Sequence, residues 1–249
     1  MKTVRLILGD QLNSNHSWFK DINENILYCI FEMRQETDYV IHHIQKVTGF
    51  FAAMRSFSKE LNEKGHLVKY LSILDKENTH SLTENLNIVL EKFQAEKFEY
   101  LLPDEYRLDK QLKVFCKDLS INNEVYETEH FYTKRDELAT FFKGKKQFLM
   151  ENFYRNMRKK HQILVINDQP EGGKWNFDKS NRKKWKENTL IPPFKSFDNN
   201  VENILAEINK AEIKTIGKIN PKYFEYPINR DQALIQLDYF CENLLVHFG

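Results

Sequence analysis

Residues 4–12 have the sequence VRLILGDQL, in which the apolar run from Val4 to Leu8 stops at Gly9-Asp10. A short apolar run that ends at a turn signal is typical of a buried strand. Because polar side chains follow it directly, the run also indicates where a parallel sheet would present its carboxyl edge. The rest of the N-terminal half must supply the partners of this strand.

Strand-like and helix-like segments alternate after this first strand. The predicted strands span 25–31, 67–73, 98–102 and 124–128, and the predicted helices span 38–61, 81–93 and 107–119. Ser81, followed by Glu84, forms a capping box at the start of the second helix. The alternation predicts an α/β fold, a doubly wound five-stranded parallel sheet with helices on both faces.

The alternation stops near Phe131. Helices are predicted at 134–142, 147–160, 200–210 and 230–247, and the Gly and Pro pairs within 163–194 predict a long, loop-rich connection. The apolar helix that ends at His247-Phe248-Gly249 favours a fragment of a longer protein. The alternative is a C-terminal helix that packs on the core.

Composition indicates a globular protein with a balanced charge. The 249 residues carry a net charge of +1 and include 19 Phe and 11 Tyr, enough for a substantial core. No apolar run approaches the roughly 20 residues of a membrane helix, and the N-terminus has no small-residue cleavage site. Cys29, Cys116 and Cys241 are isolated and have no metal-binding spacing. We therefore expect a cytoplasmic protein without membrane contact.

The first candidate site follows the first strand at Gly9, Asp10 and Gln11. In open α/β sheets, ligands bind outside the carboxyl ends of the strands, where the strand order reverses. If the order is 3-2-1-4-5, that point also receives Asp104, Glu105 and Arg107. Their acceptors suit a ligand rich in hydroxyl and N–H groups. A plain turn, with Asp10 capping a short helix, is the alternative.

A second polar group follows the second strand. Glu32 ends that strand, and the next predicted helix carries Tyr39, His42, His43 and Lys46 near its start. Because Tyr39 and His43 are four residues apart, as are His42 and Lys46, each pair would share one side of the helix. The sequence has no HExxH pattern here, so we expect no metal. Buried or helix-capping histidines are the alternative.

The third feature is a basic, aromatic segment. Residues 143–186 contain 13 Lys or Arg and 4 Asp or Glu, a local charge of +9. Lys and Arg neutralise phosphates and aromatic faces stack on unpaired bases, so the segment predicts contact with nucleic acid. A solvated helix face, with Trp175 filling a core, is the alternative.

Several motifs closely resemble the deoxyribodipyrimidine photolyase-related proteins, the iron–sulfur bacterial branch of the cryptochrome and photolyase family. The most specific are YVIHHIQK at 39–46 and GGKWNFD at 172–178, and LGDQL at 8–12 and the segment 227–249 are also similar. The resemblance extends over essentially the whole chain.

The resemblance implies a domain order and a set of cofactors. Residues 1–132 would be a Rossmann-like antenna-binding domain, 133–198 helices and an interdomain connector, and 199–249 the truncated start of a helical domain. The helical domain of such proteins holds FAD and a [4Fe-4S] cluster, and the α/β domain holds the antenna 6,7-dimethyl-8-ribityllumazine. With blue light, an electron passed from the flavin to damaged DNA reverses a photoproduct, of the (6-4) type in characterised relatives.

This chain departs from the family in lacking the four cluster cysteines and the flavin cradle. We therefore expect it to carry the antenna half, without FAD or [4Fe-4S], and to be inactive alone. No Ser-His-Asp or Cys-His arrangement predicts a catalytic residue.

Carried onto this sequence, the resemblance assigns two sets of residues. The antenna pocket would contain Gly9, Asp10, Gln11, Glu32, Tyr39, His42, His43 and Lys46. The DNA-facing side of the complete protein would contain Lys174, Trp175, Asn176, Arg182 and Lys183. The alternative function is a nucleotide- or flavin-binding module that works alone, since the fold class includes many such proteins.

Overall fold

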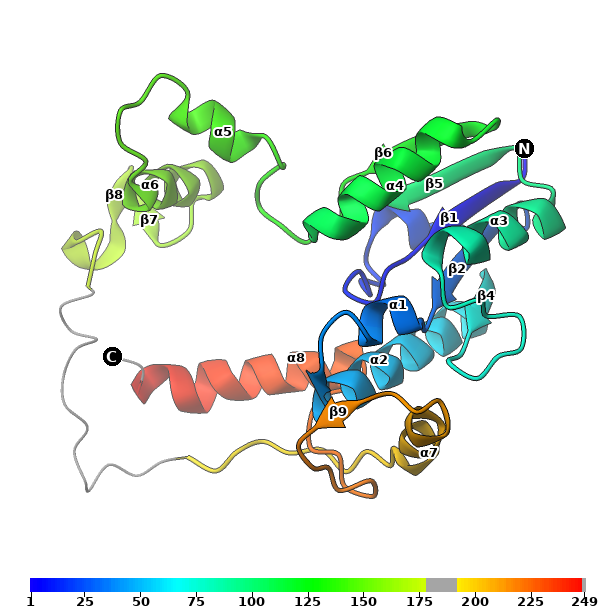
Figure 1. Ribbon diagram of the computed structural model, residues 1–249. Helices are drawn as coiled ribbons and strands as arrows, with labels where there is room; N and C mark the ends of the chain where they lie inside the picture. Colours follow the sequence, from blue (N-terminus) through cyan, green and yellow to red (C-terminus); the bar gives the residue numbers. More distant parts are fainter. Residues whose placement is uncertain (178–191, 248–249) are drawn as a thin grey trace. The chain divides into compact units, whose positions relative to one another are not determined.

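A five-stranded parallel sheet forms within the first 126 residues of the computed structural model, which describes residues 1–177 and 192–247 (Figure 1). The strands lie in the order β4-β2-β1-β5-β6. Their bounds are β1 Thr3–Leu6, β2 Ile26–Phe31, β4 Leu67–Leu71, β5 Lys97–Leu101 and β6 Asn122–Tyr126. All neighbouring pairs are parallel. Within this sheet the order is 3-2-1-4-5, and the predicted doubly wound α/β fold is confirmed.

Helices and two short sheets complete the described parts of the chain. The helices are α1 Arg34–Thr37, α2 Ile44–Glu63, α3 Leu82–Phe93, α4 Tyr106–Asp118, α5 Glu137–Phe142, α6 Met150–His161, α7 Glu202–Lys210 and α8 Arg230–Tyr239. In the short sheets, β3 (His42–His43) pairs in parallel with β9 (Thr215–Ile216), and β7 (Val165–Ile166) pairs antiparallel with β8 (Gln169–Pro170). None of the helices in the described ranges is long and apolar enough to span a bilayer.

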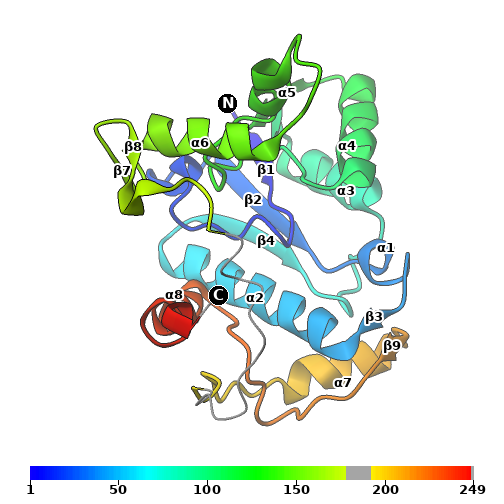
Figure 2. The same cartoon turned by 90° about the vertical axis from the view of Figure 1, so that its left-hand side faces the viewer.

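The alternation of side chains along the strands builds two core layers. Leu6 of β1 and Cys29 of β2 pack with the apolar residues of α3 and α4. Tyr28 and Ile30 of β2, and Ile7 just after β1, pack instead with the apolar stripe of α2. Because successive residues of a strand point to opposite faces, α3 and α4 cover one face of the sheet and α2 covers the other (Figure 2).

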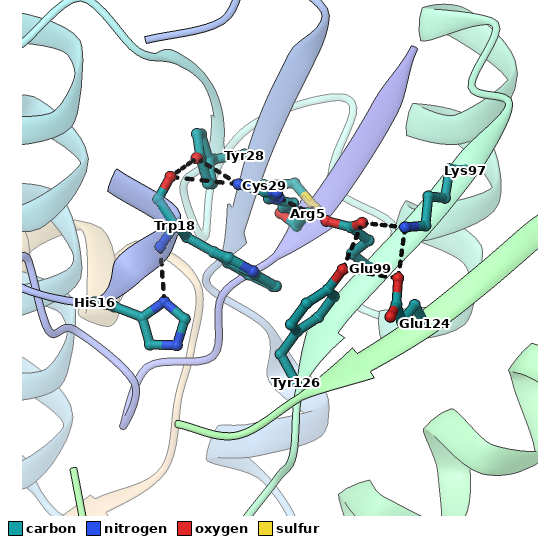
Figure 3. Close-up of polar contacts among 9 residues, drawn as sticks. All are labelled: Arg5, His16, Trp18, Tyr28, Cys29, Lys97, Glu99, Glu124 and Tyr126. Carbon is teal, nitrogen blue, oxygen red and sulfur yellow. Dashed lines mark hydrogen bonds and ion pairs between the residues drawn. The ribbon is translucent and has the colours of Figure 1, made fainter. Parts of the chain in front are cut away.

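Beyond α2, the same face of the sheet carries a polar ladder across β1, β5 and β6 (Figure 3). Arg5 Nε donates to Glu99 at 2.7 Å, and Lys97 Nζ lies 2.6 Å from both Glu99 and Glu124. The buried Trp18 ring lies over this ladder, with Arg5 Cζ 4.8 Å from its centroid. Paired charges therefore take the place of an apolar helix contact on this part of the sheet.

The start of α2 differs from the sequence prediction. The prediction of a helix from Asp38 is wrong, because α2 begins at Ile44 and His42–His43 form the extended strand β3. His43 is the N-cap of α2, where its Nδ1 accepts the amide N–H of Gln45 at 3.2 Å. His42 and His43 pair with β9, which lies more than 170 residues later in the sequence. No local pattern encodes this pairing, which keeps the segment extended.

The chain divides into two compact units. The first contains residues 1–130 and 194–238, and the second contains 131–193 and 239–249. In the first unit, α7 packs on α2, with Ile208 fully buried in the same core layer. In the second, α5 and α6 share an aromatic cluster, in which the Phe141 and Phe153 rings lie 5.1 Å apart. The division into 1–132, 133–198 and 199–249 stays a prediction.

Candidate ligand site at the carboxyl edge of the sheet

A cavity of about 210 Å³ lies in the first unit, at the carboxyl ends of β1 and β2. Its walls come from the loop after β1, the start of α2 and the N-terminus of α4. In this strand order the chain crosses from β2 to one face through α2 and from β5 to the other through α4, so the cavity lies beside the point where the winding reverses.

The loop after β1 approaches α2 closely at Gly9. A Cβ atom at this position would lie 3.0 Å from Met54 Sδ and 3.3 Å from Phe50 Cδ1. Any larger residue would push these two side chains, which both line the cavity. Glycine therefore suits this position because of the close approach of α2, and not because of an unusual backbone angle.

Asp10 brings a carboxylate to the cavity. Desolvation by the surrounding walls raises its pKa, and the negative charges of Asp104 and Glu36 add to the increase. Among the described residues, no salt bridge to Asp10 is present. Its side chain is still solvent-accessible. A backbone hydrogen bond and the charge of His130 offset part of the increase in pKa, and the accessible carboxylate can still accept hydrogen bonds from a ligand.

Tyr39, His42 and Lys46 form one continuous wall of the cavity. The Tyr39 and His42 rings meet edge to face at 5.1 Å, and Lys46 Nζ lies 3.2 Å from His42 Nδ1. On the other side, the Arg107 guanidinium lies 4.7 Å from the Tyr39 ring centroid. The structure thus brings these three predicted residues together, and it places Arg107 of α4, expected here if the strand order was 3-2-1-4-5, beside them.

The remaining polar groups of the cavity are largely used by the protein. Arg107 donates two hydrogen bonds to Glu36, at 2.7 and 3.1 Å, and also pairs with Glu105. Glu105 is the N-cap of α4 and accepts the amide N–H groups of Arg107 and Leu108. Asp10 and Lys46 are therefore the charged groups best placed to interact with a bound molecule.

Glu32 reaches the cavity from the end of β2, but its carboxylate points into a buried network. It accepts hydrogen bonds from Arg55 Nε at 2.7 Å, Arg55 Nη2 at 2.9 Å, Tyr70 Oη at 2.5 Å and the Ile73 amide at 2.7 Å. The residue is fully buried, and burial together with this carboxylate raises the pKa of Tyr70 far above its usual range. Glu32 therefore stabilises the floor of the cavity through hydrogen bonds within the protein.

Of the residues assigned to the antenna pocket, Gln11 and His43 do not line the cavity, and neither does Asp104. Gln11 is buried and ties the loop after β1 to the end of β5: it accepts the Leu8 amide at 3.1 Å and donates to the carbonyls of Leu101 and Leu102. His43 caps α2 instead. Both support the residues that do line the cavity, Gly9 and Asp10 in one case and His42 in the other.

The apolar walls were not assigned to a site by the sequence. Phe50 and Met54 line the cavity from the first turns of α2, and Met33 lines it from the end of β2. Phe50 is 42% exposed, whereas the adjacent Phe51 is 4% exposed and belongs to the core. The Phe50-Phe51 pair gives only a weak signal, because successive residues of a helix can both be buried, as Phe51 and Ala52 are.

The basic segment lies in the second unit and surrounds Trp175. Arg155, Arg158 and Lys159 of α6 each place a cationic group within 6 Å of this ring, at 5.8, 5.1 and 5.6 Å. Arg158 is buried and donates to the carbonyls of Ile163 and Leu164.

Of the predicted DNA-facing residues, three lie within the described part of the chain and two lie outside it. Lys174 and Asn176 are exposed on either side of Trp175. Arg182 and Lys183 lie outside the described residues. The described part of the segment therefore joins a half-buried ring to a cationic helix face.

The fold and the cavity define a doubly wound α/β protein with a ligand site beside its topological switch point. The chain belongs to the deoxyribodipyrimidine photo-lyase-related protein family, whose profile matches residues 5–224. This confirms the family predicted from the motifs.

Two curated proteins are similar to the chain. A (6-4) photolyase of Agrobacterium fabrum is 29% identical over 254 aligned residues, which cover 100% of this chain and 49% of that protein. The chain therefore spans about half the length of that relative. Uncharacterized protein R852 of Acanthamoeba polyphaga mimivirus is 25% identical over 190 residues, which cover 73% of this chain and 94% of the viral protein.

Proposed function

We propose that this chain binds an antenna chromophore, 6,7-dimethyl-8-ribityllumazine, and forms the light-harvesting part of a (6-4) photolyase-like or cryptochrome-like flavoprotein. The observation that carries the proposal is the cavity at the carboxyl edge of β1 and β2 in a member of this family. The similarity to a (6-4) photolyase along the whole chain supports it.

The residues around the cavity suit both parts of such a molecule. A ribityl tail carries hydroxyl groups, for which Asp10 is an acceptor and Lys46 a donor. A flat, uncharged ring system needs apolar and aromatic walls, and Tyr39, Phe50 and Met54 provide them. Because Asp10 and Lys46 carry opposite charges and line the same cavity, neither a strongly anionic nor a strongly cationic ligand is favoured.

When bound, the chromophore would absorb near-ultraviolet and blue light and pass its excitation to a flavin. This chain would contribute binding, orientation and exclusion of water, and no acid or base chemistry is required of it. In the complete protein, FAD and a [4Fe-4S] cluster would belong to the remaining part of the molecule, beyond residues 199–249, which we propose begin the helical domain.

We also propose damaged DNA as the partner of the complete protein, with Lys174, Trp175, Asn176, Arg182 and Lys183 on the DNA-facing side. The charge of +9 over residues 143–186 supports this assignment.

A fluorescence titration of the purified chain with 6,7-dimethyl-8-ribityllumazine tests the proposal. We expect saturable binding, and we expect Asp10→Ala to weaken it by about tenfold because a hydrogen-bonded carboxylate is lost. Asp21→Ala removes an exposed carboxylate outside the cavity and should leave the affinity unchanged. Equal affinities for the wild type and both variants would remove Asp10 from the site.

A nucleotide- or flavin-binding module that works alone is the second candidate. The viral relative favours it, because the match covers 94% of that protein and leaves little room for a helical half. Titration with AMP, ATP and FMN separates the two functions. Binding of these nucleotides without binding of the lumazine would support the second candidate.

A further inference from the structure

We propose that residues 211–217, which include β9, position one wall of the cavity by holding β3 and the loop before it in an extended conformation. The wall would therefore depend on a segment about 170 residues away in sequence. This inference rests on the proposed ligand site only for its binding measurement, since its structural part can be tested on the ligand-free protein.

The residues of this wall that precede β3 have few contacts with the core of the protein. Tyr39, Val40 and Ile41 are 58%, 49% and 57% exposed, so burial does not fix the loop that precedes β3. Their spacing, together with that of the following residues, favours a helix continuous with α2. In the structure, however, the helix stops short of this loop, and His42 instead contacts Tyr39 and Lys46 across the cavity wall.

Residues 211–217 hold the wall from the outside. His42 pairs with Thr215 and His43 with Ile216 in the parallel ladder of β3 and β9. At the other end of the loop, Arg34 of α1 donates to the carbonyl of Ala211, four residues before Thr215. The loop is therefore fixed at both of its ends by the same distant segment.

Gly217 leaves the space that the His43 ring occupies. Its φ is +82°, and a Cβ atom there would lie 1.8 Å from Nε2 of His43. The ring of His43 occupies the space that any side chain would need, while its Nδ1 caps α2. A methyl group at residue 217 must therefore displace His43, and with it the cap and the adjacent His42.

The segment itself is anchored to α2. Arg55 donates to both Glu32 and Glu207, at 2.7 and 2.5 Å for the shortest contacts, and so connects the floor of the cavity to α7. Ile208 and Ile213 are buried beside α2 at the two ends of the turn that leads to β9. These anchors give β9 a fixed position from which it can order β3.

Coupling between ligand and segment follows from this arrangement. If β9 stabilises the conformation that binds the ligand, the ligand must stabilise the pairing of β3 with β9 by the same factor. Amide exchange of residues 38–45 and 211–217 should therefore slow together when the lumazine binds.

The test compares Gly217→Ala with Gly144→Ala in the full chain. Gly144 also has a positive φ, +76°, but its Cβ would meet nothing within 4 Å, so it reproduces the backbone strain without the clash. In Gly217→Ala we expect faster amide exchange at residues 38–45, unchanged exchange in β1 and β5, and at least about tenfold weaker lumazine binding. Gly144→Ala should match the wild type in all three.

A double-mutant cycle with His43→Asn identifies the contact. Asparagine keeps an N-cap for α2 and frees the space beside residue 217. Gly217→Ala should then cost less than about threefold in affinity when His43→Asn is already present. If Gly217→Ala alone does not fold, a double variant that folds and exchanges like His43→Asn supports the proposal.

Two results would overturn the inference. One is wild-type exchange at residues 38–45 in Gly217→Ala, and the other is an equal effect of that substitution with and without His43→Asn. Failure of the wild type to bind the lumazine would contradict the proposed function alone, since the exchange measurements need no ligand.

Discussion

At the scale of single residues, Glu32 shows how a polar group at the cavity can be structural. Four hydrogen bonds from Arg55, Tyr70 and Ile73 end on one fully buried carboxylate. Breaking such a network strongly destabilises the fold, because the donors lose their acceptor while they remain buried away from water.

Glu32→Gln should therefore lower the free energy of unfolding by about 2–4 kcal/mol. The amide keeps the shape of the side chain but turns one acceptor into a donor that faces donors. Urea denaturation measures the change. Glu60→Gln is the matched control, because Glu60 pairs with Lys64 on an exposed part of α2, and we expect a change below about 0.5 kcal/mol. Equal effects of the two substitutions would show that the Glu32 network adds no stability.

Asp10 should show opposite effects on stability and on binding. Because its pKa is raised in the folded state, ionisation of Asp10 destabilises the fold above the unfolded pKa of about 3.9. Asp10→Asn should therefore raise the melting temperature at pH 7, and this gain should vanish near pH 3. The same substitution should weaken lumazine binding. A stability gain without a loss of affinity would indicate that Asp10 has no part in the site.

His66 gives the fold a pH dependence with the other sign. Burial against Phe19 and Tyr28 lowers its pKa, so the folded state favours the neutral form of this histidine more than the unfolded chain does, in which a histidine protonates at about pH 6.5. Stability should fall as the pH decreases below that value. In His66→Asn this decrease between pH 7 and 5 should be smaller, and His247→Asn, at an exposed position, should leave it unchanged. Melting temperatures across this range test the expectation.

At the scale of elements, local sequence signals were sufficient where neighbouring residues determine the start or the end of a helix or strand. The helix start predicted at Ser81 is confirmed, with the Ser81 side chain accepting the Glu84 amide, but the Ser81 amide donates to Thr79 Oγ1 and not to Glu84 as in a full capping box. The strands and the helices α3 and α4 were predicted from hydrophobic periodicity alone, to within a few residues.

Ser81→Ala should lower the free energy of unfolding by about 1 kcal/mol, because the first turn of α3 loses its side-chain acceptor. Ser120→Ala, at an exposed position outside any helix, should change it by less than about 0.3 kcal/mol. Chemical denaturation of both variants provides the comparison. An unchanged midpoint for Ser81→Ala would mean that water replaces the cap.

The start of α2 could not be predicted in the same way. Its apolar spacing continues backward through Val40 and Ile41, so a local pattern extends the helix to Asp38. In the structure α2 begins at Ile44, where β3 pairs with β9 and the His43 ring lies against Gly217. Contacts between residues so far apart leave no periodic signal.

At the scale of the whole molecule, the alternation of elements predicted a parallel sheet, and the order 3-2-1-4-5, assumed from the sequence and observed in the structure, locates the edge of the sheet that carries the cavity. That was enough to bring Gly9, Asp10, Tyr39, His42 and Lys46 to one site. It was not enough to tell which polar groups the protein itself would use. Glu32 and Gln11 are acceptors by type, but three-dimensional packing gives them internal partners.

The basic segment shows the same limit. Its composition predicted a cationic surface, and the described part of α6 has one. Sequence could not indicate that Arg158 would be buried to hold the following loop, or that three cations would gather around Trp175. The number of cations free to meet a phosphate is therefore smaller than the count along the chain.

A crystal structure of this chain grown with 6,7-dimethyl-8-ribityllumazine tests the central claim most directly. We predict ligand density in the cavity, with the ring system against Tyr39 and Phe50 and the ribityl tail within hydrogen-bond distance of Asp10. Density at another place, or a cavity filled by the protein's own side chains at saturating ligand, would contradict the account.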